Sequence, residues 1–199
     1  MRFFAFLLTA SLSLAAYPSN AQEAARPHSP SAKEQPPKPK PVTLDDLFDR
    51  LSKAGSEREA EGISNLIERR FARSGSDTAD LLLGRATEAF EKKEFPLAVE
   101  LLDRVLALQP NWAEAWYRRA TVFYQLDDPV GAMADLSRAL AIEPRHFNAW
   151  TGLGHILMAS DDKARALEAY RHVLTINPQQ SSVKTIVDRL IPDVDGQDL

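Results

Sequence analysis

The fold is decided by three versions of one short segment: VLALQP at residues 105–110, ALAIEP at 139–144 and VLTINP at 173–178. Their prolines, Pro110, Pro144 and Pro178, recur at one constant interval, i, i+34 and i+68. Proline lacks a backbone N–H and its ring crowds the preceding turn, so each proline ends an apolar helix and begins a link to the next one. A constant period of this length indicates a repeated structural unit.

Other positions recur with the same period. Small residues occupy one place in the first helix of each unit, at Ala86, Ala120 and Gly154. A second set of small residues lies in the second helix, at Ala98, Ala132 and Ala166. Facing small side chains allow two helices to approach closely. A generic bundle of amphipathic helices requires no such period.

Together these positions resemble the tetratricopeptide repeat, and the likeness covers residues 79–178. The resemblance implies an all-α fold, a tetratricopeptide-repeat α-solenoid in which helix hairpins stack into a right-handed superhelix. Residues 77–178 would hold three such repeats. Their expected ranges are about 79–112, 113–146 and 147–180.

Polar residues predict where helices begin inside the repeats. Asp128 stands directly before Pro129, and Asp161-Asp162 stand before Lys163, so these aspartates are expected to cap second helices. Asn111, with Glu114 three residues later, has the spacing of a capping box and is expected to cap a first helix.

Helices are also predicted on both sides of the repeats. Residues 43–76 have apolar residues at helical spacing and read as an N-terminal helical hairpin, which could also be a degenerate repeat. Residues 181–191 are expected to form a capping helix, because the last repeat must cover its apolar face. Pro192 is expected to end that helix and to leave an acidic tail at 192–199.

The N-terminus has the pattern of an export signal. Residues 1–17 read MRFFAFLLTASLSLAAY, with an apolar stretch too short to span a bilayer as a helix, which needs about 20 residues. Ser19-Asn20-Ala21 supplies small residues for cleavage, so residues 1–21 are predicted to be a signal peptide. The alternative is an uncleaved N-terminal anchor. With cleavage, we expect no membrane insertion and a periplasmic location, or secretion as the alternative.

The next segment changes in composition. Residues 22–42 hold six prolines and almost no large apolar side chain, so they are predicted to be a disordered, Pro-rich linker. The alternative is that this segment is itself a ligand for a domain that binds proline-rich peptides. This linker carries four basic and two acidic residues, which leaves a net charge of −7 on residues 43–199. A body of that sign repels phosphate backbones, so nucleic acid is not an expected partner.

No pattern in the chain indicates catalysis. Cysteine is absent, which excludes disulfides and thiolate chemistry. The four histidines have no metal-site spacing, and neither a nucleophile elbow nor a phosphate-binding glycine loop occurs. We therefore expect no catalytic residue, no metal and no cofactor.

The resemblance implies a ligand groove on the concave side, which first helices line. Carried over by position, the candidate peptide-binding residues of the second and third repeats are Glu114, Tyr117, Arg118, Thr121, Tyr124, Asn148, Thr151, His155 and Met158. The corresponding residues of the first repeat are Asp80, Leu83, Thr87 and Phe90. Some family members hold an acidic peptide terminus with lysine, arginine and asparagine. Here only Arg118 and Asn148 stand near such a set, so a basic or apolar ligand is expected.

These features together predict a non-enzymatic scaffold or adaptor in the cell envelope, which binds a peptide or helix of a protein partner in the groove. The alternative is a structural subunit of an envelope complex, which assembles through the Pro-rich tail or the N-terminal hairpin. The identity of the partner does not follow from the residues.

Overall fold

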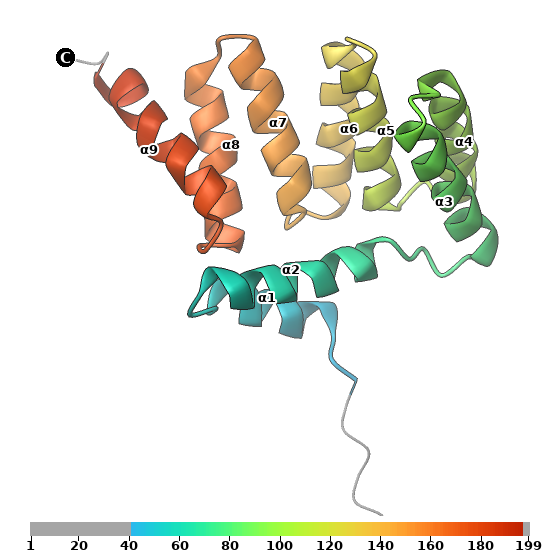
Figure 1. Ribbon diagram of the computed structural model, residues 1–199, viewed down its shortest axis with the longest axis horizontal. Helices are drawn as coiled ribbons and strands as arrows, with labels where there is room; N and C mark the ends of the chain where they lie inside the picture. Colours follow the sequence, from blue (N-terminus) through green and yellow to red (C-terminus); the bar gives the residue numbers. More distant parts are fainter. Residues whose placement is uncertain (1–40, 197–199) are drawn as a thin grey trace, which may run out of the picture. The chain divides into compact units, whose positions relative to one another are not determined.

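The computed structural model describes residues 41–196, and this range holds nine helices and no strand (Figure 1). The helices are α1 Leu44–Ser52, α2 Glu57–Phe71, α3 Asp77–Glu91, α4 Phe95–Leu108, α5 Ala113–Gln125, α6 Pro129–Ile142, α7 Phe147–Ala159, α8 Lys163–Ile176 and α9 Ser181–Asp195. The predicted signal peptide and most of the predicted linker lie outside the described residues. Among the described helices, none is long and apolar enough to cross a membrane.

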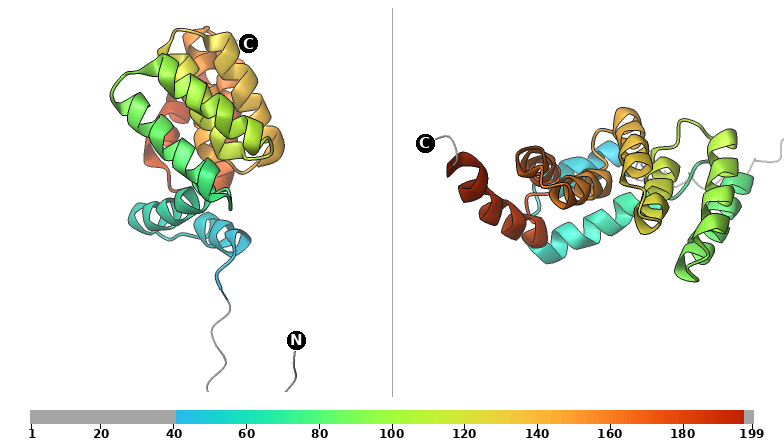
Figure 2. Two further views of the ribbon diagram at one scale, coloured as in Figure 1. Left: turned by 90° about the vertical axis from the view of Figure 1, so that its right-hand side faces the viewer. Right: turned by 90° about the horizontal axis from the view of Figure 1, so that it is seen from above.

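The repeats form three helix pairs, α3–α4, α5–α6 and α7–α8, which stand side by side in a row that α9 completes (Figures 1 and 2). Each second helix packs against its own first helix and against the first helix of the next pair. This arrangement confirms the predicted all-α tetratricopeptide-type solenoid. The register set by Pro110, Pro144 and Pro178 is visible in it, since all three lie in the links that follow α4, α6 and α8.

The turn inside each pair has one geometry. Lys93, Asp127 and Asp161 occupy the same position in successive repeats and adopt the left-handed conformation, with φ of 60°, 59° and 58°. Such a residue turns the chain sharply before the second helix starts, and aspartate tolerates this region better than most side chains.

Two of the three predicted helix caps are present. The carboxylate of Asp128 accepts a hydrogen bond from the Gly131 N–H, and that of Asp162 accepts one from the Arg165 N–H. The prediction for Asn111 is wrong. Helix α5 begins at Ala113, its capping residue is Trp112, and no side chain caps it.

The small residues are required by close helix packing, most clearly at Gly154. A Cβ built on Gly154 would lie 2.6 Å from the Tyr170 ring, whose side chain is only 1% exposed. In the other two repeats the position of Tyr170 holds Leu102 or Leu136. The first helix therefore has alanine there when it faces leucine, and glycine when it faces tyrosine.

The N-terminal hairpin, α1 and α2, does not stack as a repeat ahead of α3. It lies across the stacked helices at the end where the links between successive repeats are found (Figures 1 and 2). Its buried side chains, among them Leu47, Phe48 and Ile67, share one core with α7, α8 and α9, whereas α3 and α4 belong to a different cluster. The hairpin therefore does not extend the row of repeats at its α3 end.

Polar contacts follow the same path along α2. Near the start of α2, the hydroxyl of Ser181 on α9 donates to the Glu57 carboxylate. Farther along, the Asn148 amide donates to the Glu68 carboxylate at 2.9 Å. At the end of α2, the indole of Trp112 reaches the carbonyl of Phe71. The hairpin thus bridges the link after every repeat.

Helix α9 is longer than expected. It runs to Asp195 and contains Pro192, so the prediction that this proline ends the helix is wrong. Pro192 is exposed, and its ring costs the helix one backbone hydrogen bond. The last turn is held by other contacts: Asp193 pairs with Lys163 at 2.9 Å, and Val194 packs on the core. Residues 192–195 are therefore helix rather than tail.

Candidate functional site

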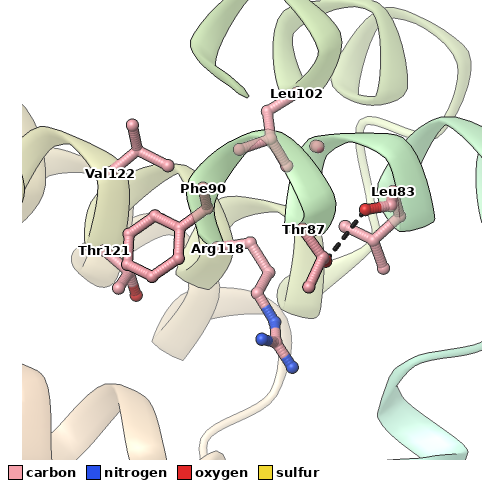
Figure 3. A pocket seen from close by; sticks show the side chains of 8 residues that line it. Leu83, Thr87, Phe90, Leu102, Arg118, Thr121 and Val122 are labelled. Atoms are coloured by element: carbon pink, nitrogen blue, oxygen red, sulfur yellow. Dashed lines mark hydrogen bonds between the residues drawn. The ribbon is translucent and has the colours of Figure 1, made fainter. Parts of the chain in front are cut away.

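Two adjoining hollows lie between the first helices of the repeats. The first, of about 40 Å³, is formed by α3 and α5 and is lined by Leu83, Thr87, Phe90 and Arg118 together with buried apolar residues (Figure 3). The second, of about 200 Å³, is formed by α5 and α7. Thr121 lines both. The two hollows therefore adjoin at Thr121, and together they are named here the α3–α5–α7 groove.

The second hollow collects most of the predicted residues. Six of the nine line it: Tyr117, Thr121, Tyr124, Asn148, Thr151 and His155. Arg118 lies in the first hollow instead, beside three of the residues expected from the first repeat. Asp80, the fourth, lines neither hollow, because its carboxylate accepts hydrogen bonds from the main chain and hydroxyl of Ser74.

Two predicted residues do not reach the groove. Glu114 is 4% exposed, and both of its carboxylate oxygens have partners inside the protein. Met158 is half-buried and packs against the core formed with α1 and α2. Neither side chain lines either hollow, in contrast to the other seven predicted residues.

The second hollow offers aromatic surface and few free polar groups. The hydroxyls of Thr121 and Thr151 donate to the carbonyls of Tyr117 and Phe147 on their own helices, so neither hydroxyl proton is available to a ligand. Tyr124 is 46% exposed and is the most accessible aromatic side chain there. This composition suits apolar side chains and a few hydrogen bonds from a ligand.

Two side chains in this hollow have shifted pKa values. Partial burial lowers the pKa of His155, so the ring is neutral at neutral pH. Burial is also the main cause that raises the pKa of Tyr117, and the negative charge of Glu114 adds to it. The phenol therefore stays protonated. Neither side chain brings a charge to the groove.

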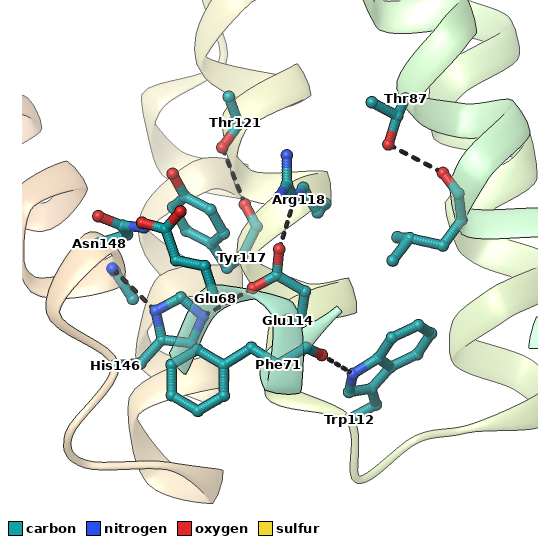
Figure 4. A network of polar contacts seen from close by, with 12 residues as sticks. Glu68, Phe71, Thr87, Trp112, Glu114, Tyr117, Arg118, Thr121, His146 and Asn148 are labelled. Carbon is teal, nitrogen blue, oxygen red and sulfur yellow. Dashed lines mark hydrogen bonds and ion pairs between the residues drawn. The ribbon is translucent and has the colours of Figure 1, made fainter. Parts of the chain in front are cut away.

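Below the groove lies a buried polar network that the sequence did not reveal (Figure 4). Nδ1 of His146 accepts the Ala149 N–H at 3.2 Å and caps α7, so the ring proton is on Nε2, which donates to Glu114 at 3.1 Å. The other oxygen of Glu114 accepts from Arg118 at 2.5 Å. The His146 ring stacks on Phe71 of α2, with centroids 4.7 Å apart. The network therefore joins the hairpin to the groove helices.

The ionisation of Glu114 follows from these partners. Burial by itself raises the pKa of a carboxyl group, but the hydrogen bond from His146 and the charge of Arg118 outweigh it, and the pKa of Glu114 is lowered. The carboxylate is thus charged and neutralised internally by Arg118. The position of His146 directly before a predicted helix was the one available signal for its capping role.

A third hollow, of about 360 Å³, continues the surface toward the hairpin. Asn148 lines both this hollow and the second one. Three carboxylates of α2 line it, those of Glu57, Glu61 and Glu68, and none of them has an ion-pair partner within residues 41–196. This end of the surface is therefore negative.

No metal-binding arrangement occurs in the described part of the chain. Residues 41–196 contain no group of three or more histidine, aspartate or glutamate side chains close enough to share an ion.

Comparisons with known proteins fit this geometry. Two models of the tetratricopeptide repeat match the chain, one at residues 88–149 and one at 123–190. A tetratricopeptide-repeat protein of Rhizobium etli is 38% identical over 92 residues, which cover 46% of this chain and 45% of that protein. The chain thus spans about half the length of the curated relative it matches.

Solved structures share the fold. The first TPR domain of Spaghetti (RPAP3), bound to the HSP90 peptide SRMEEVD, has a TM-score of 0.57 and 18% identity, over 60% of this chain and 95% of that one. The TPR2B domain of yeast Sti1, in complex with a pHsp70 ligand, has a TM-score of 0.54 and 23% identity, over 61% and 99%. The MamA protein has a TM-score of 0.54 and 20% identity, over 74% and 79%. Identities this low show the fold alone.

Proposed function

Because this chain belongs to the tetratricopeptide repeat family, we propose that it is a non-enzymatic scaffold that holds a peptide or helix of another protein in the α3–α5–α7 groove. One observation carries the proposal. Six residues expected to face a ligand from two successive repeats line a single hollow, and Thr121 borders both that hollow and the one between α3 and α5. Two of the structural neighbours, those of Spaghetti and yeast Sti1, are complexes with HSP90 and pHsp70 ligands, which supports peptide binding as the use of this face.

The ligand class follows from the charges. Among the residues that line the three hollows, Arg118 of the first hollow is the one arginine or lysine, and its charge is neutralised by Glu114. His155 adds no positive charge at neutral pH. The carboxylates of Glu57, Glu61 and Glu68 lie at the hairpin end, and none of them has an ion-pair partner within residues 41–196. An acidic peptide terminus such as SRMEEVD meets no free cation here, so the ligand we propose is apolar with basic side chains toward α2.

The cell envelope is the proposed location. The support is the signal-like sequence of residues 1–21, and a periplasm is the proposed compartment, with secretion as the alternative. Cell fractionation with detection of the mature N-terminus tests this part separately from ligand binding.

Ligand capture from envelope extract tests the groove. Tyr124→Ala/His155→Ala alters two exposed side chains of the second hollow and leaves the core intact. We expect this variant to lose the partner that wild type retains. Leu126→Ala is the matched control, because Leu126 is 43% exposed and lies just past α5 outside the hollow. Unchanged capture by the double variant would exclude the groove.

The alternative role, assembly of an envelope complex through the Pro-rich segment 22–42 or the N-terminal hairpin, predicts a different result. Deleting residues 22–40 leaves the groove intact. If partner binding is lost in that deletion but kept in the groove variant, the tail rather than the groove is the binding element.

A further inference from the structure

The free end of the repeat row exposes a surface that is buried at every later repeat. Equivalent positions of successive repeats show this directly. Ala115 and Ala149 are fully buried and Val183 is 1% exposed, because each packs against the preceding helix pair. Leu81 occupies the same position in α3 and is 58% exposed. No pair precedes α3 in the described structure, and the hairpin belongs to a different core cluster.

Helix α4 adds more apolar surface to this end. Leu97 and Leu108 are 42% and 50% exposed and lie on one stripe of α4, at i and i+11. The other side of α4 faces α5, since its Asp103 accepts a hydrogen bond from Arg119 at 2.6 Å. Leu97 and Leu108 therefore lie on a different side of α4 from Asp103, away from this contact with α5. Figures 1 and 2 show α3 and α4 with a neighbouring pair on one side only.

The same end carries an arginine, Arg85, that in the described part of the chain lacks the ion pairs made by its counterpart in the next repeat. Arg119 of α5 bridges Asp103 of the preceding pair and Asp135 of its own pair. Its counterpart one repeat earlier is Arg85, and the counterpart of Asp135 is Leu101. Arg85 has no ion pair with any residue of 41–196.

A carboxylate of opposite sign lies one turn further along α3. Glu88 is exposed, whereas its counterparts Val122 and Ile156 are each 2% exposed and packed against the preceding pair. Arg85 and Glu88 are three residues apart and so share one face of the helix.

We propose that this end face, formed by Leu81, Arg85, Glu88, Leu97 and Leu108, binds a second copy of the chain around a two-fold axis. An antiparallel α3 pair brings each Arg85 opposite the other copy's Glu88 and makes two ion pairs from one set of residues. The leucines supply apolar contact on either side. A partner surface of uniform charge would place a like charge opposite either Arg85 or Glu88. The mixed charge pattern therefore favours the end face of a second copy as the partner.

The proposal is independent of the groove, because the end face and the hollows share no residue. Sedimentation equilibrium tests the proposed dimer over a hundredfold concentration range. The sample is the protein as it is purified from the expressing cell. We expect a reversible dimer whose Kd rises at least tenfold in Arg85→Glu and in Glu88→Arg. The doubly exchanged variant Arg85→Glu/Glu88→Arg should restore dimerisation, because the ion pairs re-form with reversed polarity.

Two further variants complete the experiment. Leu81→Glu should give a monomer at all concentrations, with an unchanged circular dichroism spectrum showing that it folds. Val130→Glu alters an apolar residue that is even more accessible than Leu81, 77% exposed, and lies outside the end face, so this variant should dimerise like wild type. A wild type that is monomeric throughout overturns the proposal, and so does a double exchange that fails to restore a dimer weakened by the single exchanges.

Discussion

The indole Nε1 of Trp112 donates a hydrogen bond of 2.7 Å to the main-chain carbonyl of Phe71, across 41 residues of sequence. Trp112 precedes α5 and Phe71 ends α2, so this bond fastens the N-terminal hairpin to the link between the first two repeats. The same link position in the next repeat holds His146, whose ring stacks on Phe71. One residue of the hairpin thus organises two successive links.

Trp112→Phe should destabilise the protein by about 1–3 kcal/mol, because it keeps an aromatic ring but leaves the buried Phe71 carbonyl without its donor. Urea unfolding followed by circular dichroism measures the change. Trp116→Phe is the matched control, since the Trp116 indole donates to the Pro110 carbonyl at an exposed site where water can replace it. Its expected loss is below about 1 kcal/mol. Equal losses of unfolding free energy in the two variants would show that the hydrogen bond to Phe71 stabilises the protein no more than the exposed one to Pro110.

Gly154→Ala should lower stability although alanine favours helix. The added Cβ meets the Tyr170 ring at 2.6 Å, and overpacking of this kind costs about 1–3 kcal/mol. Gly84→Ala should have the opposite effect, a gain of up to about 1 kcal/mol, because Gly84 is an exposed helical residue with nothing within 4 Å of its Cβ site. Thermal unfolding of both variants gives the two signs. A stabilised Gly154→Ala protein would contradict the close packing of α7 on α8.

Glu114→Gln should flatten the acid limb of the stability curve. The folded protein lowers the pKa of Glu114 below its ordinary value of 4.5, so the carboxylate contributes stability that is present above pH 4.5 and is lost as the pH falls through the lowered pKa. The variant lacks this contribution. We expect its unfolding free energy to be lower at pH 7 by about 1–3 kcal/mol and to depend less on pH below 4.5. Two curves that differ by a constant at every pH would contradict the charged state of Glu114.

Much of the fold could be predicted because each feature was local. Proline at a fixed period ends a helix whatever surrounds it, and Asp128 and Asp162 cap helices through their own backbone neighbours. Gly154 had to be small because of its partner helix, and the repeat itself supplied that partner.

The errors arose where the partner lay far away in sequence. The apolar stripe of Leu47 and Phe48 predicted a buried face, but nothing in it says whether that face packs on the first repeat or on the third. Glu114 occupies a position expected to line the groove, yet the hairpin and His146 enclose it. Pro192 remains helical because the contacts of Asp193 and Val194 offset one missing hydrogen bond.

The groove residues were predicted as a set, and their chemistry only in part. Spacing placed Tyr117, Tyr124 and His155 together, and the structure brings them into one hollow. The negative end of the surface was not predicted, because it depends on α2 crossing the row beside Asn148.

The central claim, that the α3–α5–α7 groove holds a protein ligand, is tested most directly by site-specific photocrosslinking in the native cell. A photoreactive amino acid is placed at Tyr124 in one strain and at Leu126 in another, two positions of nearly equal exposure, 46% and 43%, of which only the first lines the groove. We expect a defined protein adduct at Tyr124 and none at Leu126. No adduct at Tyr124, or the same adducts at both positions, would contradict binding in the groove.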